Sequence, residues 1–476
     1  MDIKTHPLSN DKRLPFVQPE SVTVTASCLL QTTLSYALAG TAIFFVLYFF
    51  LARNEDCFGT FIAAFSSGAI GVFFCSFWFR RYHWGKIAQT AIVAAYIARV
   101  LVGVDSYLST DPHYFQGNGN YLSNNWEFYW TYENATKAAD NLLRHGEWRP
   151  SQTYEIGDTK NANIHSWMGY FLAAGKSHNA LDLAPFNSFH HVVAGIIIVG
   201  LAITLGYPLG ASFLAGVATA WIPWAFPASL MWRDSVGICW IVAAIALVVI
   251  GRNFGLVGRI TLAFPAALLA SSVREPYLLV VLVSTIYLYV NDTKKNLSVS
   301  NNVKLAIFLL IIVTGIVLIF PSLVEYVFGR HQTLQNGFWA RFATIPLLIV
   351  RGIAGPFPWI NPSGSFEMDY FPDYIFHVCQ LAVLLVLMRN WRSILLNSDV
   401  LILNSIMLWF IGVLAVGVHT AYLAVAMPFI LPVTFKANDH LWTKFIISLF
   451  LFIGGNALYL LTGLQGSGLL IKTTGY

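Results

Sequence analysis

The stretch "SLMWRDSVG" places Arg233 beside Asp234 in a part of the chain that is otherwise almost entirely apolar. An ionised side chain near hydrocarbon costs about 2.5 to 3.5 kcal/mol on insertion scales, so such side chains usually face a cavity or a substrate path. Arginine binds phosphate through a planar fork, and a neighbouring carboxylate can fix its rotamer. The pair is therefore a candidate phosphate site. The structural alternative is a local salt bridge in which Asp234 caps a helix N-terminus.

Other carboxylates and arginines stand in polar segments elsewhere in the chain. Asp105 and Asp111 occur in "VGVDSYLSTDPHYF", and Arg274 occurs in "SSVREPY". A carboxylate can accept the proton of an attacking hydroxyl, while arginine stabilises the growing charge of a phosphate leaving group. These residue types predict sugar transfer from a polyprenyl phosphate or diphosphate. The expected ligands of the lipid phosphate are Arg233, Asp234, Arg274 and Arg341.

The sequence contains no motif that is typical of a metal site. Its five cysteines form no CxxC or Cys/His spacing, so no structural zinc is expected. Two carboxylates on one face could still bind Mg²⁺ weakly together with a phosphate. Mg²⁺ is therefore the one cofactor that the sequence leaves open.

The composition defines the environment in which these side chains must act. Of the 476 residues, 57% are hydrophobic and only 11% are charged, which excludes an ordinary soluble domain. The net charge of +5 comes without a basic run or an RNA-binding signature, so no nucleic-acid partner is expected. Residues 1–33 are polar, and residues 34–476 form a single integral membrane domain. The predicted fold is an all-α bundle of transmembrane helices with about 11 to 13 crossings.

Hydropathy predicts where these crossings lie. The apolar segments are 34–51, 58–79, 87–104, 189–205, 208–226, 235–250, 260–273, 276–290, 305–320, 375–388, 400–418, 421–435 and 445–461. The pair 260–273 and 276–290 is short, so it is either two thin crossings or a hairpin that stops part way.

The distribution of Lys and Arg predicts the orientation. If the N-terminus is cytoplasmic, most short-loop basic residues fall on the cytoplasmic side, and only Arg53, Arg233, Arg274 and the tail Lys472 fall on the other side. The long polar segments 105–185 and 321–374 then both lie outside. This topology requires Arg341–Ala354 to lie in the outer interface or to re-enter the membrane.

The outer segment 105–185 contains a predicted surface helix. Ala135, Ala138 and Leu142 recur at helical spacing, and Gly146 supplies a stop signal. The aromatic residues near its start are most simply an interfacial belt, with a sugar-stacking platform as the alternative. Arg99, about one and a half turns before Asp105, is interpreted as a structural ion pair.

The chain also resembles a known class of membrane proteins. The resemblance rests on "DPHY" at Asp111–Tyr114, "YPLGASFLAGVATAWIPWAFPASLMWRDS", "GPFPW" at Gly355–Trp359 and "HTAYLAVAMPFILP". In this order they resemble bacterial inner-membrane proteins of exopolysaccharide and capsule loci, which are similar to the C-type glycosyltransferases. The resemblance implies a lipid-linked sugar donor, a glycan or lipid acceptor and a catalytic carboxylate in the first large outer loop. That carboxylate is Asp111, with Asp105 as the alternative.

Three other functions remain open. O-antigen-type polysaccharide polymerases also have many crossings, large outer loops and outer arginines. A transporter or lipid-linked glycan flippase would explain the crossings, and would be expected to carry charges near the membrane midplane. A passive membrane scaffold would need no chemistry from the outer charges. Oligomeric state and the identities of sugar and acceptor are not encoded in any motif of the chain.

The orientation can be tested by cysteine labelling. In a variant without its native cysteines, Ser151→Cys and Ser363→Cys should react with a membrane-impermeant reagent in intact cells, because both segments are predicted to lie outside. Lys86→Cys, which is predicted to lie inside, should react only after lysis. Protection of either outer position in intact cells would require a different topology.

Overall fold

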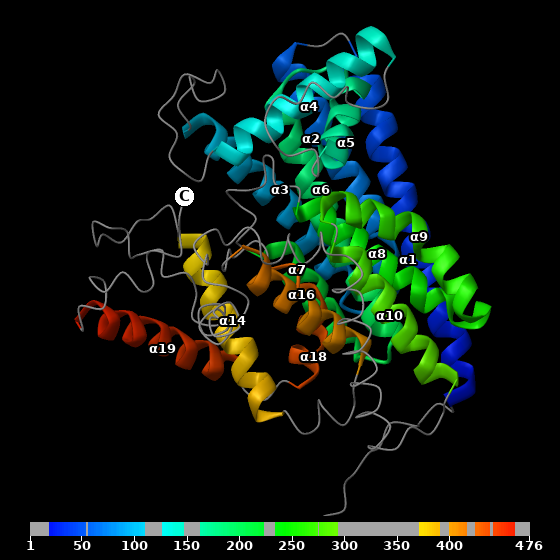
Figure 1. The fold of residues 1–476 in the computed structure, drawn as a ribbon, viewed down its shortest axis with the longest axis vertical. Helices are drawn as coiled ribbons and strands as arrows, with labels where there is room; N and C mark the ends of the chain where they lie inside the picture. The colour runs from blue at the N-terminus through cyan, green and yellow to red at the C-terminus, as the bar shows by residue number, and fades with distance from the viewer. Residues whose placement is uncertain are drawn as a thin grey trace, which may run out of the picture.

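The computed structural model describes residues 19–53, 56–109, 126–146, 162–222, 234–274, 276–293, 371–390, 399–416, 424–437 and 441–461. Within these ranges the chain forms α-helices, short 3-10 helices and turns, and no strand is present. The all-α prediction is therefore confirmed for this part of the chain. Figure 1 shows the helices side by side as a bundle.

Helices account for almost all of the described residues. They are α1 (Pro19–Leu51), α2 (Cys57–Cys75), η1 (Phe77–Arg81), α3 (Gly85–Ser109), α4 (Trp126–His145), α5 (Ala162–Ala174), η4 (Ala180–Asp182), α6 (Leu183–Thr204), α7 (Leu209–Trp221), α8 (Asp234–Ile250), η7 (Gly251–Phe254), α9 (Gly255–Val273), α10 (Pro276–Thr293), α14 (Phe371–Arg389), α16 (Val400–Val416), α18 (Met427–Lys436) and α19 (Leu441–Leu461).

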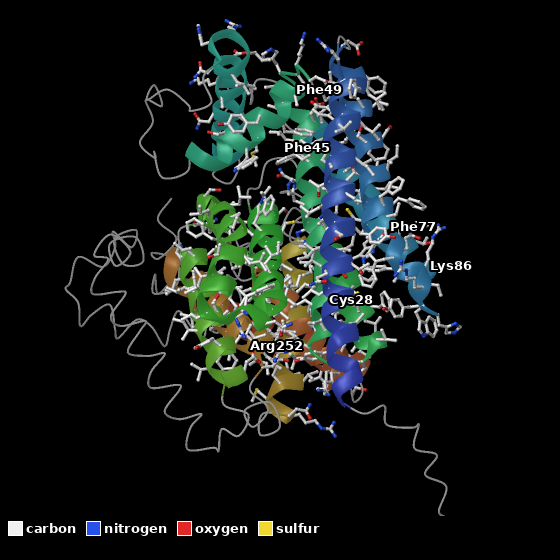
Figure 2. All side chains as sticks on the ribbon, turned by 90° about the vertical axis from the view of Figure 1, so that its right-hand side faces the viewer. Cys28, Phe45, Phe49, Phe77, Lys86 and Arg252 are labelled. Carbon is white, nitrogen blue, oxygen red and sulfur yellow. The ribbon has the colours of Figure 1, made fainter. Side chains whose placement is uncertain are left out.

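Several helices are suited to a membrane. Among the described residues, five helical stretches are long and apolar enough to cross a bilayer: Cys28–Leu51, Phe58–Arg81, Gly85–Val104, Leu183–Thr204 and Asp234–Val273. The last of these turns at η7 between α8 and α9. Large apolar side chains point outward from the bundle, including Phe50 and Phe58, and Figure 2 shows carbon-rich side chains along the outer face of α1. Since soluble monomers rarely expose large apolar patches, these helices support membrane insertion.

Most helix positions agree with the apolar segments, while several boundaries differ. The segment 235–250 corresponds closely to α8, and 276–290 lies within α10. Helix α1 begins at Pro19, well before the predicted apolar start at residue 34, and α6 begins at Leu183 rather than 189. A helix is held by its own backbone hydrogen bonds, so it continues beyond the residues that are apolar enough to contact lipid. Segment 305–320 and Arg341–Ala354 lie outside the described residues.

The predicted surface helix is present as α4. It ends at His145, and Gly146 follows with a φ of 66° and an N–H that donates to the Leu142 carbonyl oxygen at 3.1 Å. Glycine adopts this left-handed conformation without the steric cost of a Cβ, which explains the stop. Helix α4 packs along α5. Its position at the membrane surface stays a prediction.

The short pair 260–273 and 276–290 forms two complete helices, α9 and α10, that pack against each other. Arg274 adopts an extended backbone conformation after α9, and Pro276 begins α10. Proline fits the first position of a helix because the N–H that it lacks would have no partner within the helix. A single tight turn therefore reverses the chain here.

Helix α6 occupies the centre of the bundle. It packs against α1, α2, α3, α7 and α8 (Figure 1). Nearly every side chain along it is buried. On one side α8, α9 and α10 pack in succession, and on another α18 connects α7 to α16. This enclosed position keeps the polar side chains of α6, among them Asn187, His190 and His191, away from lipid.

Glycines permit the closest approaches between helices. A methyl group placed on Gly195 of α6 would lie 2.5 Å from the carbonyl oxygen of Gly216 on α7. The same relation holds between α1 and α2, where a methyl on Gly40 would lie 2.5 Å from the Gly71 oxygen. Helices in lipid associate through such small residues, since van der Waals contact replaces the hydrophobic drive.

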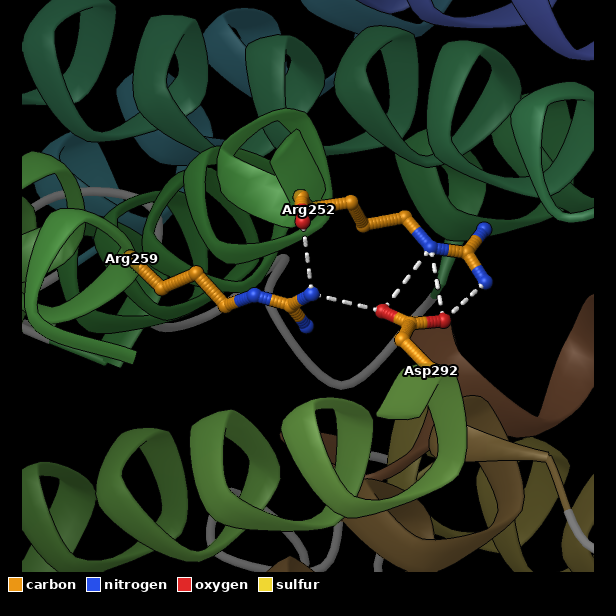
Figure 3. Close-up of polar contacts among 3 residues, drawn as sticks. All are labelled: Arg252, Arg259 and Asp292. Atoms are coloured by element: carbon orange, nitrogen blue, oxygen red, sulfur yellow. Dashed lines mark hydrogen bonds and ion pairs between the residues drawn. The ribbon is translucent and has the colours of Figure 1, made fainter. Parts of the chain in front are cut away.

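Charged side chains gather at one end of the bundle, where η7 connects α8 to α9. Asp292, near the end of α10, accepts hydrogen bonds from Arg252 Nε at 3.1 Å, and Arg259 Nη2 lies 2.7 Å from its Oδ2 (Figure 3). Arg259 Nη2 also donates to the Arg252 carbonyl oxygen at 2.9 Å. One carboxylate thus ties together η7, α9 and α10.

A second set of contacts, around Tyr207, joins further helix ends near Arg252. Tyr207, between α6 and α7, donates to Asp399 at 2.6 Å, and the Lys436 ammonium lies 5.1 Å from the centre of the Tyr207 ring. Asp399 lies close enough to Arg252 to interact with its charge. In Figure 2 Arg252 and Phe49 lie toward opposite ends of the molecule. The bundle therefore has two defined ends, and the assignment of the Arg252 end to the cytoplasm stays a prediction.

The glycine contact gives a test of the packing. Gly195→Ala should lower the unfolding temperature in detergent, because overpacking against a backbone oxygen costs about 1 to 3 kcal/mol. Gly210, on the exposed face of α7 with nothing within 4 Å of an added methyl, is the matched control. Gly210→Ala should be neutral or stabilising by up to about 1 kcal/mol. An equal effect of the two substitutions would contradict the close approach of α6 and α7.

Candidate functional site

The Asp234 and Arg274 side chains form a buried ion pair at the ends of α8 and α9 that lie away from Arg252. Arg274 Nε donates to Asp234 Oδ1 at 2.7 Å, and Nη2 donates to Oδ2 at 3.0 Å. The side chains are only 2% and 6% exposed for Asp234 and Arg274. Two parallel charge-assisted bonds fix both the position and the plane of the guanidinium.

The local fold explains how the two residues meet across 40 positions of sequence. Asp234 is the first residue of α8, and Arg274 directly follows α9, which returns antiparallel along α8 after the η7 turn. Gly237, one turn into α8, allows Val273 and Tyr277 to approach closely, since a methyl there would lie 3.0 Å from each side chain. The N-terminal position also favours the carboxylate of Asp234, because the helix dipole is positive there.

The structure brings together two of the six predicted site residues. Asp234 and Arg274 are in direct contact, which identifies Arg274 as a partner that sequence adjacency did not indicate. Asp105 lies in α3, four residues before its end, rather than in a loop. The remaining three residues, Asp111, Arg233 and Arg341, lie outside the described residues.

Two other buried polar side chains contact the backbone at the C-terminal end of α7. Arg99 of α3 is fully buried, and its Nη1 donates to the carbonyl oxygens of Ala220 and Ile222, both at 3.3 Å. His191 Nε2 donates to the carbonyl oxygen of Thr219 at 2.8 Å. The last carbonyls of a helix have no partner within the helix, so these two side chains satisfy them. Arg99 thus binds backbone carbonyls, and its ion pair with an acid stays a prediction.

Sequence reasoning did not identify the polar residues of α6. Asn187, His190 and His191 are buried in the first half of this helix, and His190 Nδ1 donates to the Phe186 carbonyl oxygen at 2.8 Å. Two adjacent histidines within an apolar segment were a usable signal, because ionisable residues inside membranes are expensive to insert and usually functional. Their carbonyl contacts fix the orientation of the rings.

The described residues offer a paired guanidinium but no cluster of the usual metal-ligating side chains. They include no group of three or more His, Cys, Asp or Glu side chains placed to hold a metal ion. Asp234 occupies Nε and Nη2 of Arg274 and neutralises its charge within the bundle. Asp234 thus fixes the orientation of the guanidinium and balances its charge. Mg²⁺ binding by Asp105 and Asp111 stays a prediction.

Comparisons with known proteins do not extend this picture. No protein-family model matches the chain, and neither the curated proteins nor the solved structures provide a match.

The ion pair predicts a specific pattern of stability changes. Arg274→Ala leaves a buried carboxylate without its cation and should destabilise the protein by about 3 to 5 kcal/mol. The double substitution Asp234→Ala with Arg274→Ala should be milder than Arg274→Ala alone, because no unpaired charge remains. Thermal unfolding in detergent measures both. If the double variant were no more stable than the single one, the two side chains would not be coupled as described.

Proposed function

We propose that this protein is an integral membrane glycosyltransferase that transfers a sugar from a polyprenyl-phosphate-linked donor to a glycan or lipid acceptor. The reaction takes place at the extracytoplasmic face of a bacterial inner membrane. The observation that carries the proposal is the buried Asp234–Arg274 pair, which fixes an arginine fork between helix ends at the predicted outer end of an apolar bundle.

In this proposal Arg274 binds the phosphate of the lipid carrier. The growing negative charge on the leaving phosphate is stabilised by a cation that is already oriented, so little reorganisation is needed in the transition state. Asp234 is a positioning residue, since it acts by holding the guanidinium. Arg233 and Arg341 are further candidate ligands of the same phosphate, and the donor's polyprenyl tail lies in lipid between helices.

The acceptor hydroxyl needs a base, and two carboxylates are candidates. Asp111 is the preferred base and Asp105 the alternative, as the resemblance to C-type glycosyltransferases implies. Asp105 lies near the end of α3, one and a half turns after the buried Arg99. The proposal requires Asp105 to lie at the same end of the bundle as Asp234. Mg²⁺ bound by these carboxylates would help to orient the phosphate.

Two other functions share some of this support. A polysaccharide polymerase would use the same acceptor and phosphate chemistry, and it would differ in making long products. A transporter or lipid-linked glycan flippase is favoured by a separate observation, the buried His190 and His191 in α6, because transport paths carry ionisable groups within the bundle. The glycosyltransferase accounts better for a charged pair located at helix ends.

The test starts from a strain in which the gene is deleted. Its lipid-linked glycans and surface polysaccharide should lack one sugar, and the wild-type gene should restore it. Asp111→Asn keeps the size of the side chain but removes the base, so it should lower the transfer rate by about 10² to 10⁴-fold at normal protein levels. The Asp234→Ala, Arg274→Ala double variant should insert stably but remain inactive.

Each alternative gives a different result. Full activity of both Asp111→Asn and Asp105→Asn would exclude the proposed transfer mechanism. An active, stable double variant would make the Asp234–Arg274 pair purely structural. Complete glycans that accumulate on the cytoplasmic side of the deletion strain would identify a flippase, and short glycans with every sugar present would identify a polymerase.

A further inference from the structure

Asp182 is a buried carboxylate that the proposed sugar transfer does not use. It ends η4, directly before α6, and is 0% exposed. Among the described residues no Lys, Arg or His side chain pairs with it. The basic residues nearest in sequence point elsewhere: Lys176 is exposed, and His178 lies 3.4 Å from Asp140 of α4. Burial raises the pKa of Asp182 to about 6, which reflects the cost of an uncompensated charge at this position.

Neutral oxygen atoms from three parts of the chain surround this carboxylate. The Tyr48 hydroxyl of α1 lies 2.8 Å from Oδ2, and the Thr60 hydroxyl of α2 lies 3.3 Å from Oδ1. The Ser177 hydroxyl lies 3.4 Å from the Thr60 hydroxyl. In addition, the Asn179 side-chain amide donates a hydrogen bond from Nδ2 to Oδ1 of Asp182 at 3.2 Å.

The spacing of these oxygens is informative. Hydrogen bonds between oxygens span about 2.5 to 3.0 Å, so the two separations that involve Thr60 are long for such bonds. Around a cation bound at about 2.3 to 2.6 Å, oxygens at right angles lie roughly 3.3 to 3.7 Å apart. The Thr60 hydroxyl therefore lies from both the Asp182 carboxylate and the Ser177 hydroxyl at the spacing of neighbouring ligands of one ion.

We propose that Asp182, Thr60, Ser177 and Tyr48 form a binding site for a monovalent cation, and that the ion is Na⁺. One carboxylate supplies one negative charge, and the other three ligands are neutral hydroxyls, so a single positive charge neutralises the site. Hydroxyl groups can rotate to turn their lone pairs toward an ion. Ca²⁺ and Mg²⁺ usually bind more than one carboxylate or keep several waters, and K⁺ requires oxygens farther apart.

The site is held in place by packing. The Tyr48 ring stacks on Phe171 of α5, with ring centres 4.2 Å apart and planes 12° from parallel. A methyl group on Gly175 would lie 2.4 Å from the Tyr48 ring, so only glycine fits beside it. Bound Na⁺ would thus join the outer ends of α1 and α2 to the start of α6. This role is independent of the proposed sugar transfer.

The test compares salts at equal ionic strength. The unfolding temperature of the purified full-length protein in detergent should rise with NaCl concentration relative to choline chloride, because a ligand that binds only the folded state stabilises it. KCl should give a much smaller rise. Asp182→Asn and Thr60→Val should abolish the difference between sodium and choline.

Asp399→Asn is the matched control, since Asp399 is a half-buried carboxylate that is also bonded to a tyrosine, but lies near Lys436. It should keep the full sodium response. If Asp182→Asn does not fold, Ser177→Ala should shift the half-maximal response to higher sodium. Equal unfolding temperatures of the wild type in sodium and choline, an equal response to KCl, or an unchanged response in Thr60→Val and Ser177→Ala would each overturn the assignment.

Discussion

A charge enclosed within an apolar helix bundle must be compensated, and this constraint determines how the helix ends are connected. Asp234 is compensated by Arg274, and Asp292 by two arginines that come from η7 and α9. Each of these contacts joins elements that are distant in sequence or separated by a turn. Because the charged side chains cluster at the ends of helices, compensation fixes those ends and leaves the helix interiors free to be apolar.

Between the ends a different interaction holds the helices together. Lipid is as apolar as the side chains, so contact between helices gains little from the hydrophobic effect and depends on close packing. The glycine crossings of α6 with α7 and of α1 with α2 provide this contact. The enclosed α6 carries the buried polar residues Asn187, His190 and His191, while the lipid-facing α1 presents exposed phenylalanines. Each of these two helices therefore has the composition that its position requires: polar side chains where the helix is enclosed, and apolar ones where it is exposed.

The sequence predicted the helices better than the site. Hydropathy located α8 and α10, and spacing together with Gly146 located α4 and its end, because these signals are local. Asp234 and Arg274 were both predicted as site residues, but their pairing depends on how α9 returns along α8, which no local pattern encodes. The adjacent Arg233 was the simplest partner available from sequence. The polar environment of Asp182 was missed for the same reason, since Tyr48 and Thr60 are more than 100 residues away.

The ion pair also bears on how an arginine can serve phosphate chemistry inside a membrane protein. A lone guanidinium at this position would be costly to bury, and Asp234 removes much of that cost before any substrate arrives. The same carboxylate weakens the attraction of Arg274 for a ground-state phosphate, since the two anions share one cation. As charge grows on the departing phosphate, its share of that cation increases. In the proposed reaction the pair would therefore bind the transition state better than the substrate, which is the requirement for raising the rate of the chemical step.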